Sequence, residues 1–379
     1  MLKFFLRNLF TSVVSIFIFL LIMFYGINIL IPGDFLTPLR LMMSQEELDA
    51  LRETLGANDP LIQQYYRWIQ SVFSGEITPG GFRQRSSKSV LDTVFPTLHV
   101  LIPSFIISIY LSRIPALKTS VKRLGKEKIF SDTFGILLIS LFPPIIYFLI
   151  GERLENTFRS LFDRFDITGT SSELLLFSEM KLGLGFLIFI VACSFIIVSF
   201  FEVIALINIP LKKLMISASL LIIIFLFFES QEVVAMLYYS KNAFITIGIL
   251  TTLLIGEFIL FNNIIVQNIS KEDHIMTAAA IGYSNHKIFK DHIIRNSFFP
   301  FATRIAINLP YTIASLVIVE STTGWGGMGS MLYRVIMSQD SNAAMAILFL
   351  LAILTATLRL MITFSQVVFN PQLRGARNV

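Results

Sequence analysis

Eight long apolar runs constrain the fold of this chain more than any other feature of its sequence. An α-helix that crosses a bilayer needs about 20 consecutive, mostly apolar residues. The runs lie at residues 9–31, 94–114, 134–150, 182–208, 214–228, 243–267, 301–319 and 343–369. Of the 379 residues, 55% are hydrophobic and only 15% are charged, a balance that excludes a soluble domain. We therefore predict an all-α polytopic membrane protein with about eight transmembrane helices.

Two of these runs leave alternatives open. The run at 214–228 is short for a span, so a six-span chain with one buried or re-entrant segment also fits the sequence. The run at 9–31 follows Lys3 and Arg7, as in a secretory signal, but its apolar core is too long and no small-residue cleavage site follows it. We expect this first run to remain as a membrane anchor.

Basic residues predict the orientation of the chain. They fill every even-numbered loop and the C-terminal tail, as Lys118, Lys122, Arg123, Lys126, Lys128, Lys212, Lys213, Lys271, Lys287, Lys290, Arg295, Arg374 and Arg377. Because lysine and arginine are in excess in cytoplasmic loops, these loops and both termini are predicted to be cytoplasmic. The long first loop, residues 34–93, is then external. Within it, Ser44 and Glu47 have the spacing of a capping box, which predicts short amphipathic helices.

A polar segment lies between the sixth and seventh runs, on the predicted cytoplasmic side. Ser270 and Asp273 are spaced as a helix start, and Gly282 offers a left-handed helix stop. Ser284 can cap a second helix that runs to about Asn296. One stripe of this second helix is formed by Ile288, Phe289, His292 and Ile293. Pro300 is expected to follow its end. The segment is therefore predicted to form a helix, a glycine turn and a helix.

This segment resembles the EAA-type cytoplasmic loop of the membrane subunits of type I bacterial ABC importers, in particular that of the B-type permease of dipeptide and oligopeptide importers. In that subgroup the loop reads E-D-Y-V-R-T-A-R-A-K-G-L-S, followed by a basic helix that ends R-N-A-L-L-P. The residues of this chain in matching register are Glu272, Asp273, Thr277, Ala278, Ala280, Gly282, Ser284, Arg295, Asn296 and Pro300. Met276 is a departure, because the general motif has a glutamate there.

The resemblance extends to both ends of the chain. Residues 30–34 are similar to the family's L-x-P-G-D, and residues 55–68 are similar to its L-G-L-D-x-P-x-x-x-Q-Y-x-x-W. Residues 319–329 resemble V-E-x-x-F-x-W-P-G-x-G, with Gly326 in place of the proline. Residues 370–374 resemble the closing D-P-R-x-R.

About residues 1–115 and 244–375 carry the resemblance, whereas residues 118–241 do not. Because related subunits resemble six-span proteins, we predict a divergent insertion at 118–241 that adds a hairpin, residues 182–228, to a six-span core. The predicted regions of the chain are a cytoplasmic end with the first transmembrane helix at 1–33, an external loop with short helices at 34–93, and a permease domain at 94–379 with its docking loop at 270–300.

The resemblance implies a transmembrane permease subunit of an ABC importer, which forms half of a translocation path for peptides. Implied partners in a bacterial cytoplasmic membrane are a second permease subunit, two ATP-binding subunits that carry ATP and Mg, and an extracytoplasmic substrate-binding protein. The residues implied in docking the ATPase are Glu272, Asp273, Thr277, Ala278, Ala280, Gly282, Ser284 and Arg295, of which the two alanines would allow close approach. Those implied at the external end of the path are Glu320, Trp325, Gly327 and Gly329. The same architecture could import nickel chelates, haem or sugars instead.

Other function classes find little support in the residues. No Walker A motif of the form GxxxxGK[ST] occurs, so we expect the chain to have no ATPase site of its own. A single cysteine, Cys193, excludes an internal disulfide or a cysteine metal site, and the histidines do not recur at a ligand spacing, so we expect no bound cofactor. Acidic residues within or beside apolar runs, namely Glu202, Glu229 and Glu257, are the only support for an ion-coupled secondary transporter.

Overall fold

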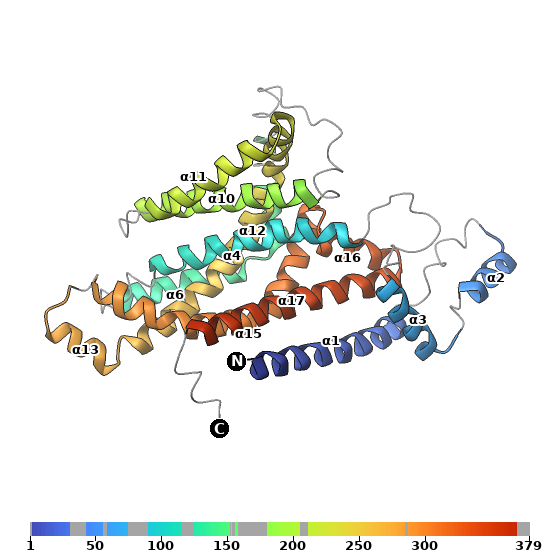
Figure 1. Cartoon of the computed structure of the whole chain (residues 1–379), viewed down its shortest axis with the longest axis horizontal. Helices are drawn as coiled ribbons and strands as arrows, with labels where there is room; N and C mark the ends of the chain where they lie inside the picture. The colour runs from blue at the N-terminus through green and yellow to red at the C-terminus, as the bar shows by residue number, and fades with distance from the viewer. Residues whose placement is uncertain are drawn as a thin grey trace. The chain divides into compact units, whose positions relative to one another are not determined.

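The computed structural model describes residues 2–30, 43–55, 59–74, 90–115, 125–151, 153, 156–157, 180–204, 211–284 and 287–369. Every element in these ranges is a helix (Figure 1), which confirms the all-α prediction. The chain divides into two units, Met1–Val94 with Gly326–Val379, and Phe95–Trp325. The motif residues 31–34, 56–58 and 370–374, and the basic residues Lys118, Lys122, Arg123, Arg374 and Arg377, lie outside the described residues.

The first unit is built on two long helices that pack along each other. These are α1 (Leu2–Leu30) and α17 (Ser341–Phe369), and α3 (Leu61–Ser74) lies against α1. Their shared core is largely aromatic and consists of Leu20, Phe24, Tyr65, Trp68 and Met345, all buried. Trp68 of α3 meets Phe349 of α17 edge to face, with 6.3 Å between ring centroids. The second helix of the first loop is thus tied to two membrane helices.

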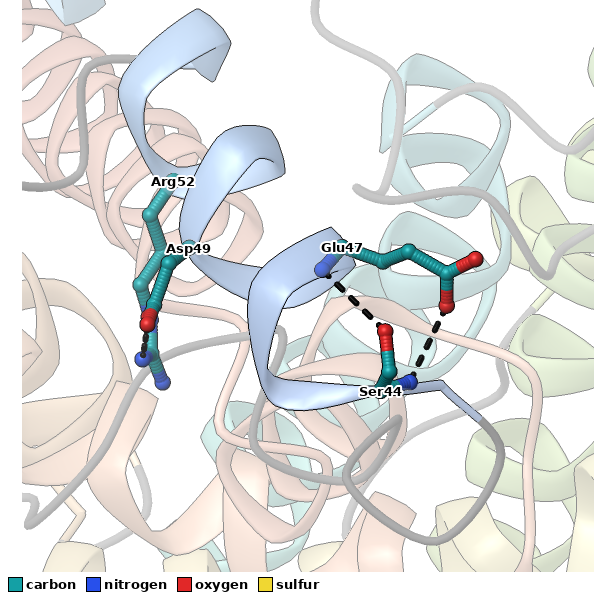
Figure 2. Close-up of polar contacts among 4 residues, drawn as sticks. All are labelled: Ser44, Glu47, Asp49 and Arg52. Carbon is teal, nitrogen blue, oxygen red and sulfur yellow. Dashed lines mark hydrogen bonds and ion pairs between the residues drawn. The ribbon is translucent and has the colours of Figure 1, made fainter.

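The first loop also contains the capping box that the sequence predicts. α2 (Gln45–Leu55) begins where the backbone N–H of Ser44 donates to Oε2 of Glu47 at 3.0 Å and the N–H of Glu47 donates to Oγ of Ser44 at 3.3 Å (Figure 2). Arg52 pairs with Asp49 at 3.0 Å on the same helix. This reciprocal bonding confirms the predicted cap. Two short helices complete this unit, η2 (Val90–Thr93) and α16 (Met328–Met337).

The second unit is organised around α12 (Ser230–Ile269), a continuous helix of 40 residues. The helices that pack along it are α4 (Val94–Leu111), α6 (Gly125–Ser140) and α15 (Ile294–Thr323). α15 runs antiparallel to α12. The hydroxyl of Thr246, in the first half of α12, donates to that of Thr323 at the end of α15 at 3.1 Å, and Phe258 further along α12 contacts Phe301 nearer the start of α15. Since Ile269 leads into the polar segment, we call this end of the unit the docking end.

α4 runs parallel to α12 and is joined to it by buried hydroxyl groups. Ser104 donates to the carbonyl oxygen of Ile247 and Ser108 to that of Thr251, each at 3.3 Å. Buried side-chain donors that find a backbone acceptor on the neighbouring helix avoid the cost of an unsatisfied polar group in an apolar setting. α4 therefore ends at the docking end, beside the end of α12.

α6 approaches α12 closely and runs antiparallel to it. A Cβ atom on Gly256 would lie 2.7 Å from the carbonyl oxygen of Gly135, so only glycine allows the two backbones to come this near. Toward the docking end, Nδ2 of Asn263 donates to the Ser131 hydroxyl and to the Asp132 carboxylate, both at 2.8 Å. A glycine contact and a buried polar contact thus hold α6 in place.

α10 (Met180–Ile204) runs parallel to α4. Near the start of both helices, Nε2 of His99 lies 2.8 Å from the carbonyl oxygen of Gly183. Further along, Tyr110 faces Phe195 with 6.4 Å between ring centroids. Because α4 and α10 both end at the docking end, the chain between them must return through the unit.

α11 (Leu211–Phe227) runs back along α10, as the predicted hairpin requires. Lys213 at its start forms an ion pair with Glu202 at the end of α10. At the opposite end of the pair, Phe228 lies against Gly185. The two helices therefore form an antiparallel hairpin whose connection lies at the docking end.

Six helices in the described part of the chain are long and apolar enough to cross a membrane, and a bent pair of shorter helices could make a seventh span. The six are Leu6–Ile27, Val90–Pro115, Leu182–Glu202, Asn242–Ile269, Asp291–Thr323 and Ala343–Val367. The two predicted runs that are not among these six helices are those at 214–228 and 134–150. α11 has 17 residues and extends about 26 Å, less than the hydrocarbon core. The run at 134–150 is broken, because α6 and α7 (Pro143–Ile146) meet at 90°.

Candidate functional site

The polar segment forms a helix, a turn and a second helix at the docking end, as predicted. α13 (Asp273–Ala280) is followed by a turn at Gly282 and then by η5 (Ile288–Ile293), a π-helix that continues without a break into α15. The second helix does not end near Asn296, which corrects the prediction. Pro300 lies inside α15. A proline in a membrane helix removes one backbone hydrogen bond, but the helix continues when neighbouring helices satisfy the freed carbonyl group.

The start of α13 also differs from the prediction. Ser270 terminates α12 instead of capping α13, and its hydroxyl donates back to the carbonyl oxygen of Val266 at 2.6 Å. Glu272 is the N-cap residue, with an extended backbone and no side-chain cap. α12 continues to this point because Val266 and Ile269 are buried on its apolar stripe. The spacing of Ser270 and Asp273 fits a helix end as well as a helix start.

Gly282 ends α13 in the left-handed conformation that the sequence predicts, with φ at 90°. Its N–H donates to the carbonyl oxygen of Ala279 at 3.0 Å, and the N–H of Tyr283 donates to that of Ala278 at 3.3 Å. These two bonds are the Schellman arrangement, which satisfies carbonyl groups at a helix end. A residue with a Cβ atom would be strained at this φ.

Ser284 caps the second helix, which confirms another prediction. The N–H of Lys287 lies 3.3 Å from the Ser284 hydroxyl, and the N–H of Ile288 lies 3.0 Å from its carbonyl oxygen. Of the residues predicted on one stripe, Ile288, Phe289 and Ile293 are buried and His292 is partly buried.

A small apolar core fixes both helices to the end of α12. It consists of Val266, Ile269, Ile275, Ala278, Ile288, Phe289 and Ile293. Ala278 is only 5% exposed in this core, so its small side chain serves packing within the chain. Our expectation that Ala278 offers a partner-facing surface is therefore wrong, whereas Ala280 is exposed as expected.

A polar chain of contacts, which we did not predict, also joins the two helices. Nδ1 of His274 lies 3.2 Å from Oε2 of Glu272, and its Nε2 lies 3.1 Å from Nδ2 of Asn296. In the turn between the helices, the ring of Tyr283 stacks on His292 of the second helix with 6.1 Å between centroids, and the ammonium group of Lys287 lies over the Tyr283 ring at 4.2 Å. The sequence shows these polar residues, but which of them contact one another depends on how the two helices pack.

The outward face of α13 remains exposed, and we call it the docking stripe. It consists of Asp273, Met276, Thr277, Ala280 and Ile281, which are spaced three and four residues apart. Met276 is 61% exposed and Ile281 is 69% exposed, so two large apolar side chains lie on this outward face. Glu272, Gly282, Ser284 and Arg295 are also exposed beside the stripe. Of the predicted docking residues, all except Ala278 are therefore accessible to a partner.

The residues predicted at the external end of the path are buried within their own units. In the second unit Glu320 is fully buried, and the buried Trp325 donates its indole N–H to the carbonyl oxygen of Pro96 at 2.8 Å. In the first unit Gly327 precedes α16 and Gly329 lies inside it, and both are buried. Their role at the external end of the path remains a prediction.

The three acidic residues named for an ion-coupled transporter lie far apart. Glu202 pairs with Lys213 at the docking end, and Glu229 forms the capping box at the opposite end of the unit, where α12 begins. Glu257 lies midway along α12 and accepts a hydrogen bond from Asn308 of α15. The three side chains therefore form no relay with one another.

Two family models match this chain. A model described as "binding-protein-dependent transport system inner membrane component" matches residues 188–375, and one for the N-terminal part of such a component matches residues 1–88. The first match includes the docking stripe, α12 and α15. Residues 89–187, which hold α4 and α6, lie outside both matches, so the predicted divergent region at 118–241 overlaps the unmatched part only up to residue 187.

Two of the relatives share low identity over most of their length, and a third is more similar over a short part. The dipeptide transport system permease protein DppB of Escherichia coli (strain K12) is 21% identical over 381 residues, 99% of each chain. The oligopeptide transport system permease protein AppB of Bacillus subtilis (strain 168) is 21% identical over 348 residues, 90% of each chain. The oligopeptide transport system permease protein OppB of Mycobacterium tuberculosis (strain ATCC 25618 / H37Rv) is 36% identical over 76 residues, 20% of this chain and 23% of that one. With both family models in agreement, this chain belongs to the binding-protein-dependent transport system inner membrane components, as a permease subunit of an ABC importer.

Proposed function

We propose that this chain is the transmembrane permease subunit of an ABC importer of peptides. The relatives are named as permeases of dipeptide and oligopeptide transport systems, which favours peptides over nickel chelates, haem or sugars. It is the transport component of its complex, and hydrolysis of ATP with Mg belongs to partner subunits.

The docking stripe is the single observation that carries the coupling role. Its exposed apolar side chains, Met276 and Ile281, stand beside the charged Asp273 on a helix that is otherwise fixed to the chain by its buried face. Such a mixed apolar and charged surface suits a protein partner, since an isolated apolar patch in water is unfavourable. The partner is an ATP-binding subunit.

Movement of the partner reaches the membrane through two helices. The core beneath the docking stripe joins α13 to the last turn of α12, at Ile269, and to the start of α15, at Ile293. Both helices then run through the second unit side by side, with Phe258 and Phe301 in edge-to-face contact at 5.4 Å between centroids. A displacement of α13 on ATP binding therefore moves α12 and α15 together and opens or closes the path by alternating access.

The composition and orientation of the complex follow the same proposal. This chain supplies half of the path, a second permease supplies the other half, two ATP-binding subunits dock below, and a substrate-binding protein delivers peptide outside. Both termini and the docking end are cytoplasmic. The orientation is supported by Arg113 and Lys213, which lie at the same end as the docking stripe, where positive charge is expected to be cytoplasmic.

Co-purification in detergent tests the docking role. Met276→Asp should release the ATP-binding subunits while the second permease stays bound, because it places a charge in an apolar contact. Asn268→Asp, on an exposed position of α12 outside the docking stripe, is the matched control and should retain both partners. Wild-type retention of the ATPase by Met276→Asp would refute the assignment of the stripe.

Peptide uptake by vesicles that contain the whole complex tests the substrate. We expect labelled peptides of several residues to enter and to stimulate ATP hydrolysis. The peptide assignment is refuted if a nickel chelate, haem or a sugar does both and peptides do neither. The two-permease composition fails if this chain alone, with ATPase added, forms a homodimer that transports.

A further inference from the structure

One face of α15 is exposed on this chain and carries polar residues at the middle of a membrane span. Its exposed positions are Pro300, Thr303, Arg304, Ile307, Pro310, Tyr311, Ala314 and Ile318, which follow helical spacing. Tyr311 lies near the middle of the apolar run at 301–319, and Arg304 lies three residues inside the end of that run nearer the docking end. Tyr311 is 73% exposed.

A carboxylate on α12 lies beside this face. Glu257 is half-buried near the middle of the span Asn242–Ile269, and Asn308 of α15 donates a hydrogen bond to its Oε1. One turn closer to the docking end, the guanidinium of Arg304 lies over the ring of Phe261 at 5.2 Å from the centroid. An acid and a base thus stand about one helical turn apart along the seam between α12 and α15.

A lipid environment does not suit this seam. Ionisable side chains at membrane depth are costly in hydrocarbon and face a bundle interior or a water-filled cavity. Pro310 adds a second reason, because it has no N–H to give to the carbonyl group of Ala306, four residues earlier, and that group needs water or another donor. The exposed face of α11 shows the contrast, since its residues from Ile222 to Phe227 are all apolar.

We propose that the seam around Glu257, Arg304, Asn308 and Tyr311 lines the water-filled path and binds the charged groups of a passing peptide. This inference rests on the proposed function and names its site. The guanidinium of Arg304 pairs with the peptide carboxylate, and the carboxylate of Glu257 accepts from the peptide amino group. The two charged groups are about one helical turn, roughly 5 Å, apart along the seam, a spacing of the same order as the roughly 7 Å of an extended dipeptide.

Thiol labelling tests whether the seam faces water. The sequence has one cysteine, so Cys193→Ala gives a cysteine-free background for Tyr311→Cys. In the assembled transporter, a charged methanethiosulfonate should modify Tyr311→Cys, and transported peptide should slow the reaction. Phe225→Cys, at a position 70% exposed on the apolar face of α11, should remain unmodified. If Tyr311→Cys is as unreactive as Phe225→Cys in every nucleotide state, lipid or the second permease covers the seam and the inference is wrong.

Removal of the charges of Glu257 and Arg304 tests whether the seam binds a passing peptide. Glu257→Gln and Arg304→Gln should each lower peptide uptake per ATP hydrolysed about tenfold, the value of a lost charge-assisted hydrogen bond. Arg304→Lys keeps the charge and should recover most of the uptake, whereas Lys212→Gln, an exposed cation at the docking end, should change nothing. Wild-type coupling in both glutamine variants would overturn the inference, while failure of the unmodified complex to import any peptide would instead refute the proposed function.

Discussion

Replacement of Gly256 by alanine should loosen the contact between α6 and α12. The new Cβ atom would lie 2.7 Å from the carbonyl oxygen of Gly135 and 2.9 Å from Cβ of Leu138. Neither atom is the end of a flexible side chain, so the two helices must separate by several tenths of an ångström. Overpacking of this kind costs about 1–3 kcal/mol.

The matched control is Gly248→Ala on the same helix, where nothing lies within 4 Å of the added methyl group. Alanine there should stabilise the helix by about 0.5–1 kcal/mol, because glycine loses more backbone entropy on folding. Unfolding of the purified complex in mixed detergent micelles would give both free energies. Equal stability of Gly256→Ala and Gly248→Ala would refute the close packing of α6 on α12.

Three further predictions concern the docking end and α6. Gly282→Val should destabilise the folded docking end by about 1–3 kcal/mol, because valine is strained at this positive φ, and should uncouple ATP hydrolysis from uptake. Gly282→Asn should retain coupling. Equal coupling in the two variants would contradict the strain. Asp273→Lys should weaken retention of the ATPase most at low salt, where charges are least screened, and a salt-independent loss in pull-down assays would exclude a charge contact. Asn263→Leu removes the hydrogen bonds to the buried Ser131 and the partly buried Asp132 on α6, and should cost about 1–3 kcal/mol in the same micelle assay. Unchanged stability would mean that water replaces these bonds.

Local rules predicted the parts of the docking end that depend on neighbours in sequence. Gly282 ends a helix because few residues adopt positive φ, and Ser284 caps the next helix because its hydroxyl reaches the N–H three residues on. The spacing that places Ala280 on the outward stripe follows from helical geometry alone.

Features that depend on tertiary packing were missed. The sequence pattern cannot show that Ala278 faces inward, because this is decided by the side chains of Ile288 and Phe289 from the next helix. The burial of Glu320 and Trp325 likewise depends on packing between elements that the sequence pattern does not reveal. The apolarity of a run likewise does not reveal the right-angle bend between α6 and α7.

The length of α12 has a mechanical consequence for signalling between the two sides of the membrane. A helix of 40 residues is about 60 Å long, twice the thickness of the hydrocarbon core. The sequence of this helix contains no proline, and close contacts along its middle resist bending. A tilt of about 5° at the docking end would therefore shift the opposite end by roughly 5 Å if the helix moves as one body. Under the docking role proposed above, α12 would transmit a displacement of α13 to the far side of the bilayer.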